Sequence, residues 1–141
     1  MGDRITSSTG TAGDDVREVD TIRNESVFAR WGKVCPKVVL TDERIAHIRE
    51  GHAKDYEDLG NHIGATIESP TIILEENKNP FTAYFVKRIE ESNLNVVVRL
   101  KIEGVDAEDL QSSVITMYRL GEKTLVRLLK RNIILNNSDK A

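Results

Sequence analysis

Hydrophobic and polar positions change their period at about residue 70. Upstream, apolar residues recur every three to four positions, which predicts a helix over Thr41–His52 and a second over Tyr56–Ile67. Downstream, β-branched and aromatic runs separated by Asn, Pro, Gly and Asp predict strands at Thr71–Leu74, Ala83–Ile89, Leu94–Ile102 and Ser113–Arg119. This order predicts an α+β fold, with N-terminal helices packed on one face of a four-stranded or slightly larger antiparallel sheet.

Weaker signals flank these elements. Asn24–Val34 carries apolar residues at helical spacing and is expected to form a short helix or an extended arm. The β-branched Lys37–Leu40 is expected to form a short strand. Gly121 precedes a last amphipathic helix with its leucines inward, and Ile133–Leu135 is expected to add a final strand.

The chain is long enough for one domain with one modest core. Residues 1–20, rich in Gly, Ser, Thr and Asp, predict a disordered tail or linker, which leaves 21–141 as a single domain with its core at about 37–135. No apolar run approaches the roughly 20 residues that span a membrane, and no secretory signal is visible, so we expect no membrane association. A single cysteine and the absence of Cys and His clusters predict no disulfide, metal or cofactor.

Charge is distributed unevenly along the chain. The formal net charge of −3 argues mildly against nucleic-acid binding. Residues 41–80 carry four basic and nine acidic side chains, whereas residues 81–132 carry nine basic and seven acidic ones. One half therefore suits an anionic ligand and the other a basic partner, although solvated helix and strand faces give the same asymmetry without any function.

Short motifs follow one another in an order known from a nuclease family. A strand leads into Leu-Thr-x-Glu-Arg-x-x-His-Ile-x-x-x-His, then come Pro-x-x-Ile, two strands and Ser-Val-Ile-Thr-x-Tyr. This pattern resembles the BECR nuclease superfamily, which groups barnase, EndoU, colicin D and RelE-like RNases, and especially its phage and toxin-associated branch. The resemblance covers about Lys37 to Leu135, and its residues are Leu40, Thr41, Glu43, Arg44, His47, Ile48, His52, Pro70, Ile73, Ser113, Val114, Ile115, Thr116 and Tyr118.

The resemblance implies a fold, an activity and a setting. The fold is a small α+β domain with helices followed by a four-stranded antiparallel sheet, and the activity is metal-independent RNA cleavage on the concave face of that sheet. The setting is a toxin effector domain of the kind used in contact-dependent inhibition. Such a domain is delivered by a larger exported protein and acts in the bacterial cytoplasm on RNA, often tRNA. An immunity protein or antitoxin neutralises it.

Cleaving RNA without a metal requires a base for the ribose 2′-OH and an acid for the leaving 5′-oxygen. Histidine suits both roles because its ordinary pKa lies near neutrality. His52, just after the expected helix end at Gly51, is the first candidate, and His47 within the helix is the second. A lone helical histidine is often structural, and His62, outside the motif, is expected to be so.

A cation at the reacting phosphate would stabilise the extra charge of the transition state. Lys87 and Arg88 are neighbours on one expected strand, so only one of them can face the site. Lys87 is slightly preferred, Arg99 on the next strand is the alternative, and Arg88 is a candidate phosphate ligand. Each is about as easily explained as a solvent-facing charge on a half-exposed sheet.

Hydroxyl groups of the strand Ser113–Arg119 complete the candidate site. A period of two places Val114, Thr116 and Tyr118 on one face, where Thr116 and Tyr118 can bind phosphate oxygens or orient a histidine. Ser113, at the start of the strand, is a weaker candidate for phosphate binding. Threonine and tyrosine also occur in strands for packing alone.

The sequence supports two main hypotheses from different classes. One is a metal-independent endoribonuclease that cleaves by 2′-OH transesterification. The other is a non-catalytic protein-interaction module on the same scaffold, which the acidic half favours. A phosphotransfer or ADP-ribosyl-transfer enzyme is less favoured because no nucleotide-cofactor loop is visible. Convergence of His52, Thr116 and one cation on a cleft would favour the nuclease, and a broad apolar patch would favour the module.

Overall fold

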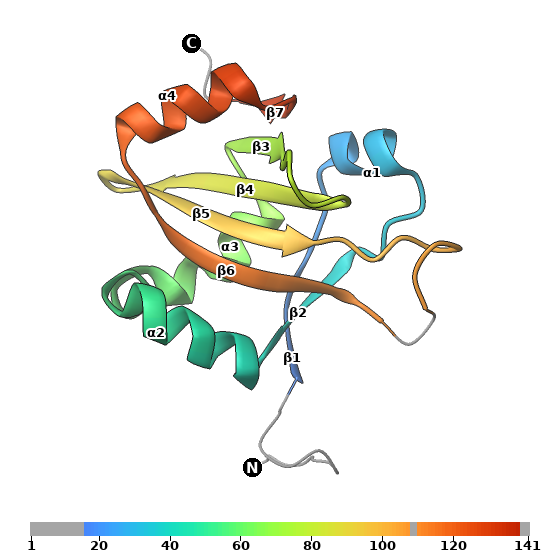
Figure 1. Ribbon diagram of the computed structural model, residues 1–141, viewed down its shortest axis with the longest axis horizontal. Helices are drawn as coiled ribbons and strands as arrows, with labels where there is room; N and C mark the ends of the chain where they lie inside the picture. The colour runs from blue at the N-terminus through green and yellow to red at the C-terminus, as the bar shows by residue number, and fades with distance from the viewer. Residues whose placement is uncertain (1–15, 108–109, 139–141) are drawn as a thin grey trace.

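The computed structural model describes residues 16–107 and 110–138. Its strands form one seven-stranded mixed sheet in the order β1-β2-β6-β5-β4-β3-β7 (Figure 1). Neighbouring strands pair antiparallel, except for β2 and β6, which are parallel. The strands are β1 (Val16–Thr21), β2 (Lys37–Thr41), β3 (Ile72–Glu75), β4 (Thr82–Ile89), β5 (Ser92–Arg99), β6 (Ser112–Leu120) and β7 (Ile134–Asn137).

Helices flank the sheet on both sides. Those of the described residues are α1 (Glu25–Trp31), α2 (Asp42–Leu59), the 3-10 helix η1 (Gly60–His62), α3 (Ile63–Glu68) and α4 (Glu122–Arg131). The α+β class and a helix within Asn24–Val34 are thereby confirmed. Within the described ranges, no helix combines the length and the apolar composition that crossing a membrane requires.

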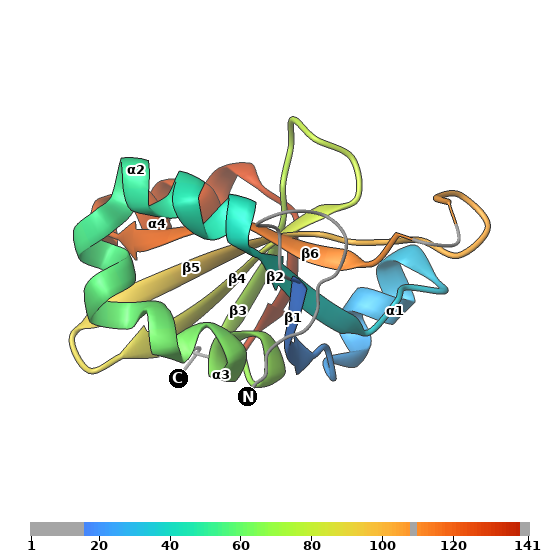
Figure 2. The same cartoon turned by 90° about the horizontal axis from the view of Figure 1, so that it is seen from below.

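Side-chain alternation along the strands gives the sheet two faces, each with its own core. On the first, which we call the α3 face, α2 and α3 cover the buried side chains of Phe85, Leu94 and Val96. On the second, the α4 face, Leu125 of α4 packs with the buried Val86. Figure 2 shows α3 on one side of the sheet and the loop between β3 and β4 rising from the other. The helices therefore cover both faces, because the chain crosses the second face between β6 and β7.

Helix α2 starts where the sequence predicts but does not end there. The Thr41 hydroxyl accepts a hydrogen bond from the backbone N–H of Arg44 at 3.2 Å, which satisfies one free donor of the first turn. At His52 the backbone leaves the helical region (φ −141°, ψ 46°). The chain then returns to helix as far as Leu59. Gly51–His52 is thus a kink rather than a helix end.

The apolar stripe of the second expected helix is buried as predicted, with Leu59, Ile63 and Ile67 in the core of the α3 face. Leu59 nevertheless belongs to α2 and the two isoleucines belong to α3, with η1 between these helices. The single helix predicted over Tyr56–Ile67 is therefore wrong in its boundaries but right in its buried side.

Strand β6 has a sheet neighbour along only part of one edge. Its parallel pairing with β2 is limited to Ser112 and Ser113, after which β2 runs into α2. Helix α2 then lies along the rest of this edge (Figure 1). The Asp55 carboxylate accepts a hydrogen bond from the backbone N–H of Arg119 at 3.0 Å, so a helix side chain satisfies a strand donor there.

Three expectations about the sheet need correction. The sheet has seven strands rather than four or slightly more, and it is mixed rather than antiparallel because β2 and β6 are parallel. Strand β1 also includes residues 16–20, which the sequence pattern places in the tail. The sequence of β1 is mostly polar and its first half is exposed, so it lacks the apolar alternation that marks a strand. Residues Val16–Thr21 form a strand because their backbone pairs with β2, and not because their side chains are buried. The rest of the predicted tail, residues 1–15, lies outside the described residues.

Close packing of α3 on β1 gives a test of this added strand. A Cβ atom at Gly64 would lie 2.9 Å from the backbone oxygen of Val19, so one element would have to shift. We expect Gly64→Ala to lower the free energy of unfolding by about 1–3 kcal/mol in denaturant titrations.

Gly51→Ala is the matched control, because a Cβ atom there meets nothing within 4 Å and alanine favours helix. Its stability should be unchanged or higher by up to about 1 kcal/mol. Equal stability of Gly64→Ala and the wild type would show that β1 does not pack against α3.

Candidate active site

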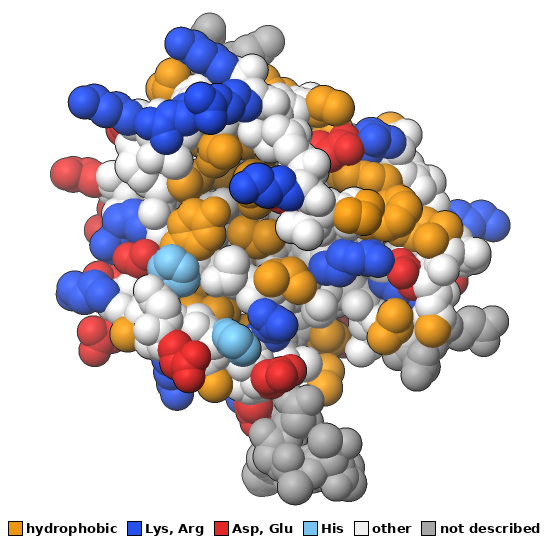
Figure 3. All heavy atoms as spheres, in the orientation of Figure 1, with side chains coloured by type: hydrophobic (Ala, Val, Ile, Leu, Met, Phe, Trp, Pro, Cys, Tyr) orange, Lys and Arg blue, Asp and Glu red, His pale blue; other side chains and the backbone are white. Residues whose placement is uncertain are grey.

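A cavity of about 500 Å³ opens on the α4 face, where strands β4, β5 and β6 meet the loop between β3 and β4. Figure 3 views this face: apolar side chains occupy its centre, Lys and Arg side chains gather over α4, and histidine side chains appear over α2. The cavity is lined by Glu76, Asn79, Pro80, Thr82, Tyr84, Val97, Arg99, Ile115, Thr116 and Tyr118. It is therefore a mostly apolar hollow with a few polar groups, as ligand sites commonly are.

A β-bulge in β6 decides which side chains face this cavity. Val97 pairs with Thr116 but Val98 pairs with Val114, so Ile115 is an extra residue in β6. Thr116 and Tyr118 consequently line the cavity, whereas Val114 is buried on the α3 face. The expectation that all three share a face is wrong for Val114, because the bulge shifts the alternation.

His52 lies against the ring of Tyr118. The two ring centroids are 5.1 Å apart and the planes are tilted by 30°. His52 is half-buried at the kink of α2, whereas His47 is exposed earlier on the same helix. Tyr118 thus lines the cavity and also contacts His52, so the histidine lies against a wall of the cavity.

Two tyrosine hydroxyls and one carboxylate meet in the cavity. Burial, the nearby Tyr118 and the Glu76 carboxylate raise the pKa of Tyr84 to about 12. Burial also raises the pKa of Tyr118, an effect that the Asn95 amide opposes and Glu76 reinforces. The Tyr84 hydroxyl donates to Glu76 Oε2 over 3.5 Å, a long contact. At neutral pH both tyrosines are therefore protonated and available as hydrogen-bond donors.

Glu76 also shapes the wall of the cavity. Its Oε1 atom accepts hydrogen bonds from the backbone N–H groups of Lys78 at 3.0 Å and Asn79 at 2.6 Å. The carboxylate therefore holds the loop between β3 and β4 in a tight turn. Because the loop carries Asn79 and Pro80 into the lining, Glu76 sets the position of that wall.

Asn95 is a buried polar residue beneath the tyrosines. It lies directly across from Tyr118 in the sheet, is fully buried, and neither its amide nitrogen nor its amide oxygen has a hydrogen-bond partner. The amide is near enough to the Tyr118 hydroxyl to affect its pKa without hydrogen-bonding geometry. A buried polar group without a partner ordinarily costs about 1–3 kcal/mol.

Arg99 is the cation in the cavity lining, and it is already paired. Its guanidinium donates to Asp106 Oδ1 at 3.0 Å and to the backbone oxygen of Leu100, and it lies 5.3 Å from the ring centroid of Phe81. The backbone N–H of Ile102 and, next, Arg99 lower the pKa of Asp106. Arg99 therefore brings a partly neutralised charge to the site.

The other predicted phosphate ligands lie apart from the cavity. Lys87 is on the α3 side of β4, where its ammonium donates to the backbone oxygen of Ser69 at 2.8 Å. Arg88 pairs with Glu122 at 2.6 Å. Ser113 borders a separate hollow of about 180 Å³. The structure thus brings Thr116, Tyr118 and Arg99 to one cavity, with His52 against Tyr118, but it does not bring Lys87, Arg88 or Ser113 there.

Sequence reasoning missed several groups around the cavity. Tyr84, Glu76 and Asn95 have no motif, although an asparagine within a Val-rich strand is a detectable anomaly. Helix α4 adds an exposed basic row, spaced about one turn apart, of Lys123, Arg127, Lys130 and Arg131. No acidic side chain in the part of the chain that the structure describes forms an ion pair with this row, so its charge is available to an anion.

No group of three or more His, Cys, Asp or Glu side chains within residues 16–107 and 110–138 is arranged to hold a metal ion. Comparisons with protein-family models, with curated proteins and with solved structures found no match to this chain. Any function proposed for this chain therefore rests on its geometry rather than on a relative.

The raised pKa of Tyr84 predicts how stability depends on alkaline pH. The fold favours the protonated phenol, so this contribution to the free energy of unfolding is complete below pH 10 and is lost as the pH rises to about 12. Ultraviolet titration should show a tyrosine that ionises near pH 12 and that disappears in Tyr84→Phe. A Tyr84→Phe titration identical to that of the wild type would contradict the assignment.

Proposed function

We propose that the α4 face binds RNA and cleaves its backbone by attack of the ribose 2′-OH on the adjacent phosphate. The observation that carries this proposal is the His52 ring against Tyr118 at a cavity of about 500 Å³. In this reaction the 2′-oxygen bonds to phosphorus, the bond to the 5′-oxygen breaks, and a 2′,3′-cyclic phosphate remains. One group must accept the 2′-proton and another must protonate the leaving oxygen.

His52 is assigned as the base because its ring contacts Tyr118, which lines the cavity. His47 precedes it by five residues on the same helix, roughly 7.5 Å along the axis, and is assigned as the acid. The protonated hydroxyls of Tyr118 and Thr116 donate to the phosphate oxygens. Each of these hydrogen bonds stabilises the phosphorane more than the substrate, because the phosphate oxygens carry more negative charge in the phosphorane.

Cationic support comes from two places in this proposal. Arg99 lies in the cavity lining, although Asp106 takes part of its charge. The exposed basic row of α4 flanks the face and can follow a phosphate backbone that leaves the cavity. A local basic surface thereby offsets the net charge of −3.

The non-catalytic interaction module is the second candidate, and one observation favours it. Among the described residues that line the cavity, Arg99 is the sole Lys or Arg, and it is paired with Asp106. A cleft built for a phosphorane would ordinarily present a freer cation. In an interaction module, the basic row of α4 would bind an acidic partner.

The remaining expectations rest on the resemblance alone. They include the BECR family, the toxin setting, tRNA as the substrate, an immunity partner and delivery to the bacterial cytoplasm. The order of α2 and α3 before β3 to β6 and the position of His52 at a cavity wall are compatible with them.

Incubation with total RNA in EDTA tests the catalytic proposal. We expect discrete products with cyclic-phosphate ends from the wild type and a loss of at least about 100-fold in rate for His52→Ala. The control is His62→Ala, another half-buried histidine, which borders a different hollow and should cleave normally. Equal rates for the wild type and both variants would show that His52 takes no part in cleavage. If neither the wild type nor the variants cleave RNA, the interaction module is favoured.

Charge reversal on α4 tests the binding surface separately. Lys123→Glu with Arg127→Glu should weaken RNA binding and lower the slope of log affinity against log salt by about 1 per lost phosphate contact. Fluorescence anisotropy with the His52→Ala background measures binding without cleavage. The same charge change in Lys33→Glu with Arg49→Glu, exposed residues outside the cavity lining, serves as the control. Equal weakening by both pairs would refute a specific role for α4.

A further inference from the structure

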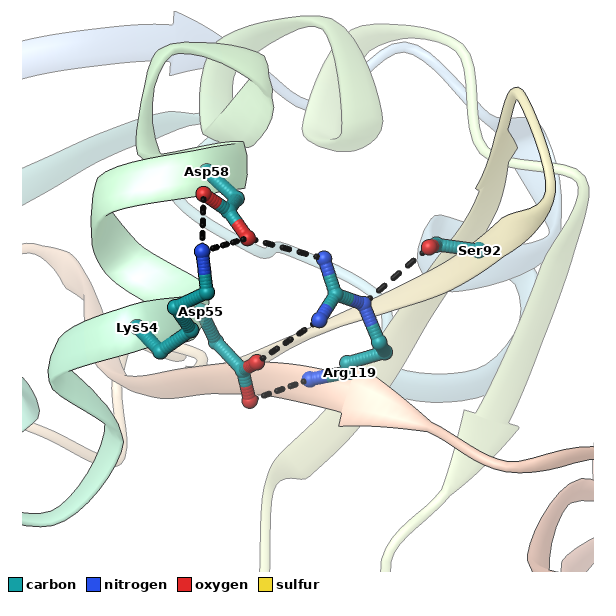
Figure 4. A network of polar contacts seen from close by, with 5 residues as sticks. All are labelled: Lys54, Asp55, Asp58, Ser92 and Arg119. Atoms are coloured by element: carbon teal, nitrogen blue, oxygen red, sulfur yellow. Dashed lines mark hydrogen bonds and ion pairs between the residues drawn. The ribbon is translucent and has the colours of Figure 1, made fainter.

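The kink at His52 divides α2 into two segments, and a compact polar network fixes the second segment to β6 (Figure 4). Arg119 is the centre of this network. Its backbone N–H donates to Asp55 Oδ2 at 3.0 Å and its Nη1 atom lies 3.4 Å from Asp55 Oδ1. Its Nη2 atom lies 3.4 Å from Asp58 Oδ2, and its Nε atom donates to Ser92 Oγ at 3.0 Å. The network thus joins α2, β6 and the start of β5.

We infer that Asp55 and Arg119 are positioning residues that hold the His52 ring against Tyr118. Arg119 directly follows Tyr118 in β6, and Asp55 follows His52 by three residues in α2. Two adjacent strand residues therefore contact the same helical turn, one through the histidine ring and the other through the carboxylate. A shift of α2 along β6 would have to break both contacts together.

We call the contacts of Asp55 with Arg119, which join α2 to β6, the clamp. The backbone hydrogen bond is its central part. At Arg119, β6 has no strand partner on its α2 side, because β2 pairs only with Ser112 and Ser113. Asp55 takes the place of a strand acceptor there and so fixes the register of helix against strand. The side-chain ion pairs are partly exposed, with side-chain exposures of 38% for Arg119 and 21% for Asp55, so they add little to overall stability. The effect of the clamp is therefore on geometry.

The direct test is the nuclear Overhauser effect between the His52 and Tyr118 rings in the full chain. We expect Asp55→Ala to abolish it while circular dichroism and the melting curve still show a folded domain. Asp55→Asn retains an oxygen acceptor for the Arg119 N–H and should keep the ring contact. Arg119→Gln retains that N–H but loses the guanidinium, and it should weaken the contact in part.

Arg88→Gln is the matched control, since it removes an exposed arginine of β4 that is paired with Glu122 of α4 and lies outside the Arg119 network, and it should leave the ring contact unchanged. A ring contact that persists in folded Asp55→Ala would overturn the inference. So would an equal loss in Arg88→Gln, because that would point to general destabilisation.

The catalytic consequence rests on the proposed function. If His52 is the base, Asp55→Ala should lower kcat by about tenfold or more with little change in KM, because misplacing a catalytic group affects the chemical step. Asp55→Asn should recover most of this loss. Absence of cleavage in every variant would count against the proposed function. The presence or absence of the ring contact in Asp55→Ala would still test the clamp. Reduced kcat with an unchanged ring contact would overturn the clamp alone.

Discussion

The limited pairing of β6 with β2 is the constraint on which the site depends. After Ser112 and Ser113, β2 gives way to α2, and the remaining edge of β6 needs another partner for its backbone groups. Helix α2 fills this place, with Asp55 as an acceptor for the strand. Because α2 must follow β6 closely, the histidine at its kink meets Tyr118. The contact that the proposed chemistry needs is therefore a consequence of where the pairing of β6 with β2 stops.

A second constraint separates the two faces of the sheet. The extra residue Ile115 shifts the alternation in β6, so that Val114 is buried against α2 and α3 while Thr116 and Tyr118 turn toward α4. The chain then crosses that face as α4 to reach β7 at the far edge. Helix α4 packs on Val86 through its Leu125, and the cavity opens beside this contact, around Tyr84 and Thr116. The cavity is the part of the α4 face that none of the described helices covers.

The sequence predicts local structure well because periodicity reflects which side of each element is buried. The stripe of Leu59, Ile63 and Ile67 and the strand at β6 follow from this rule. Strand β1 could not be predicted in this way, since its polar residues owe their conformation to pairing with β2. The full sheet order is likewise a property of long-range pairing, which no local pattern contains.

The candidate site was predicted only in part, for a related reason. Motif position identified His52, Thr116 and Tyr118, which the structure places together. A period of two could not reveal the bulge at Ile115, nor could it say which face of β4 holds Lys87. Residues such as Glu76 and Asn95 become notable only through their hydrogen bonds or the lack of them. Site geometry here depends on tertiary contacts more than on local sequence.

The most direct measurement of the central claim is a nuclear magnetic resonance titration with single-stranded RNA that carries a 2′-deoxy substitution, which binds without being cleaved. The account predicts that chemical-shift changes concentrate on His52, Thr116, Tyr84, Tyr118 and the exposed face of α4. Shifts confined to α1, α3 and the α3 face, or an absence of shifts at RNA concentrations that saturate other RNA-binding domains, would contradict it.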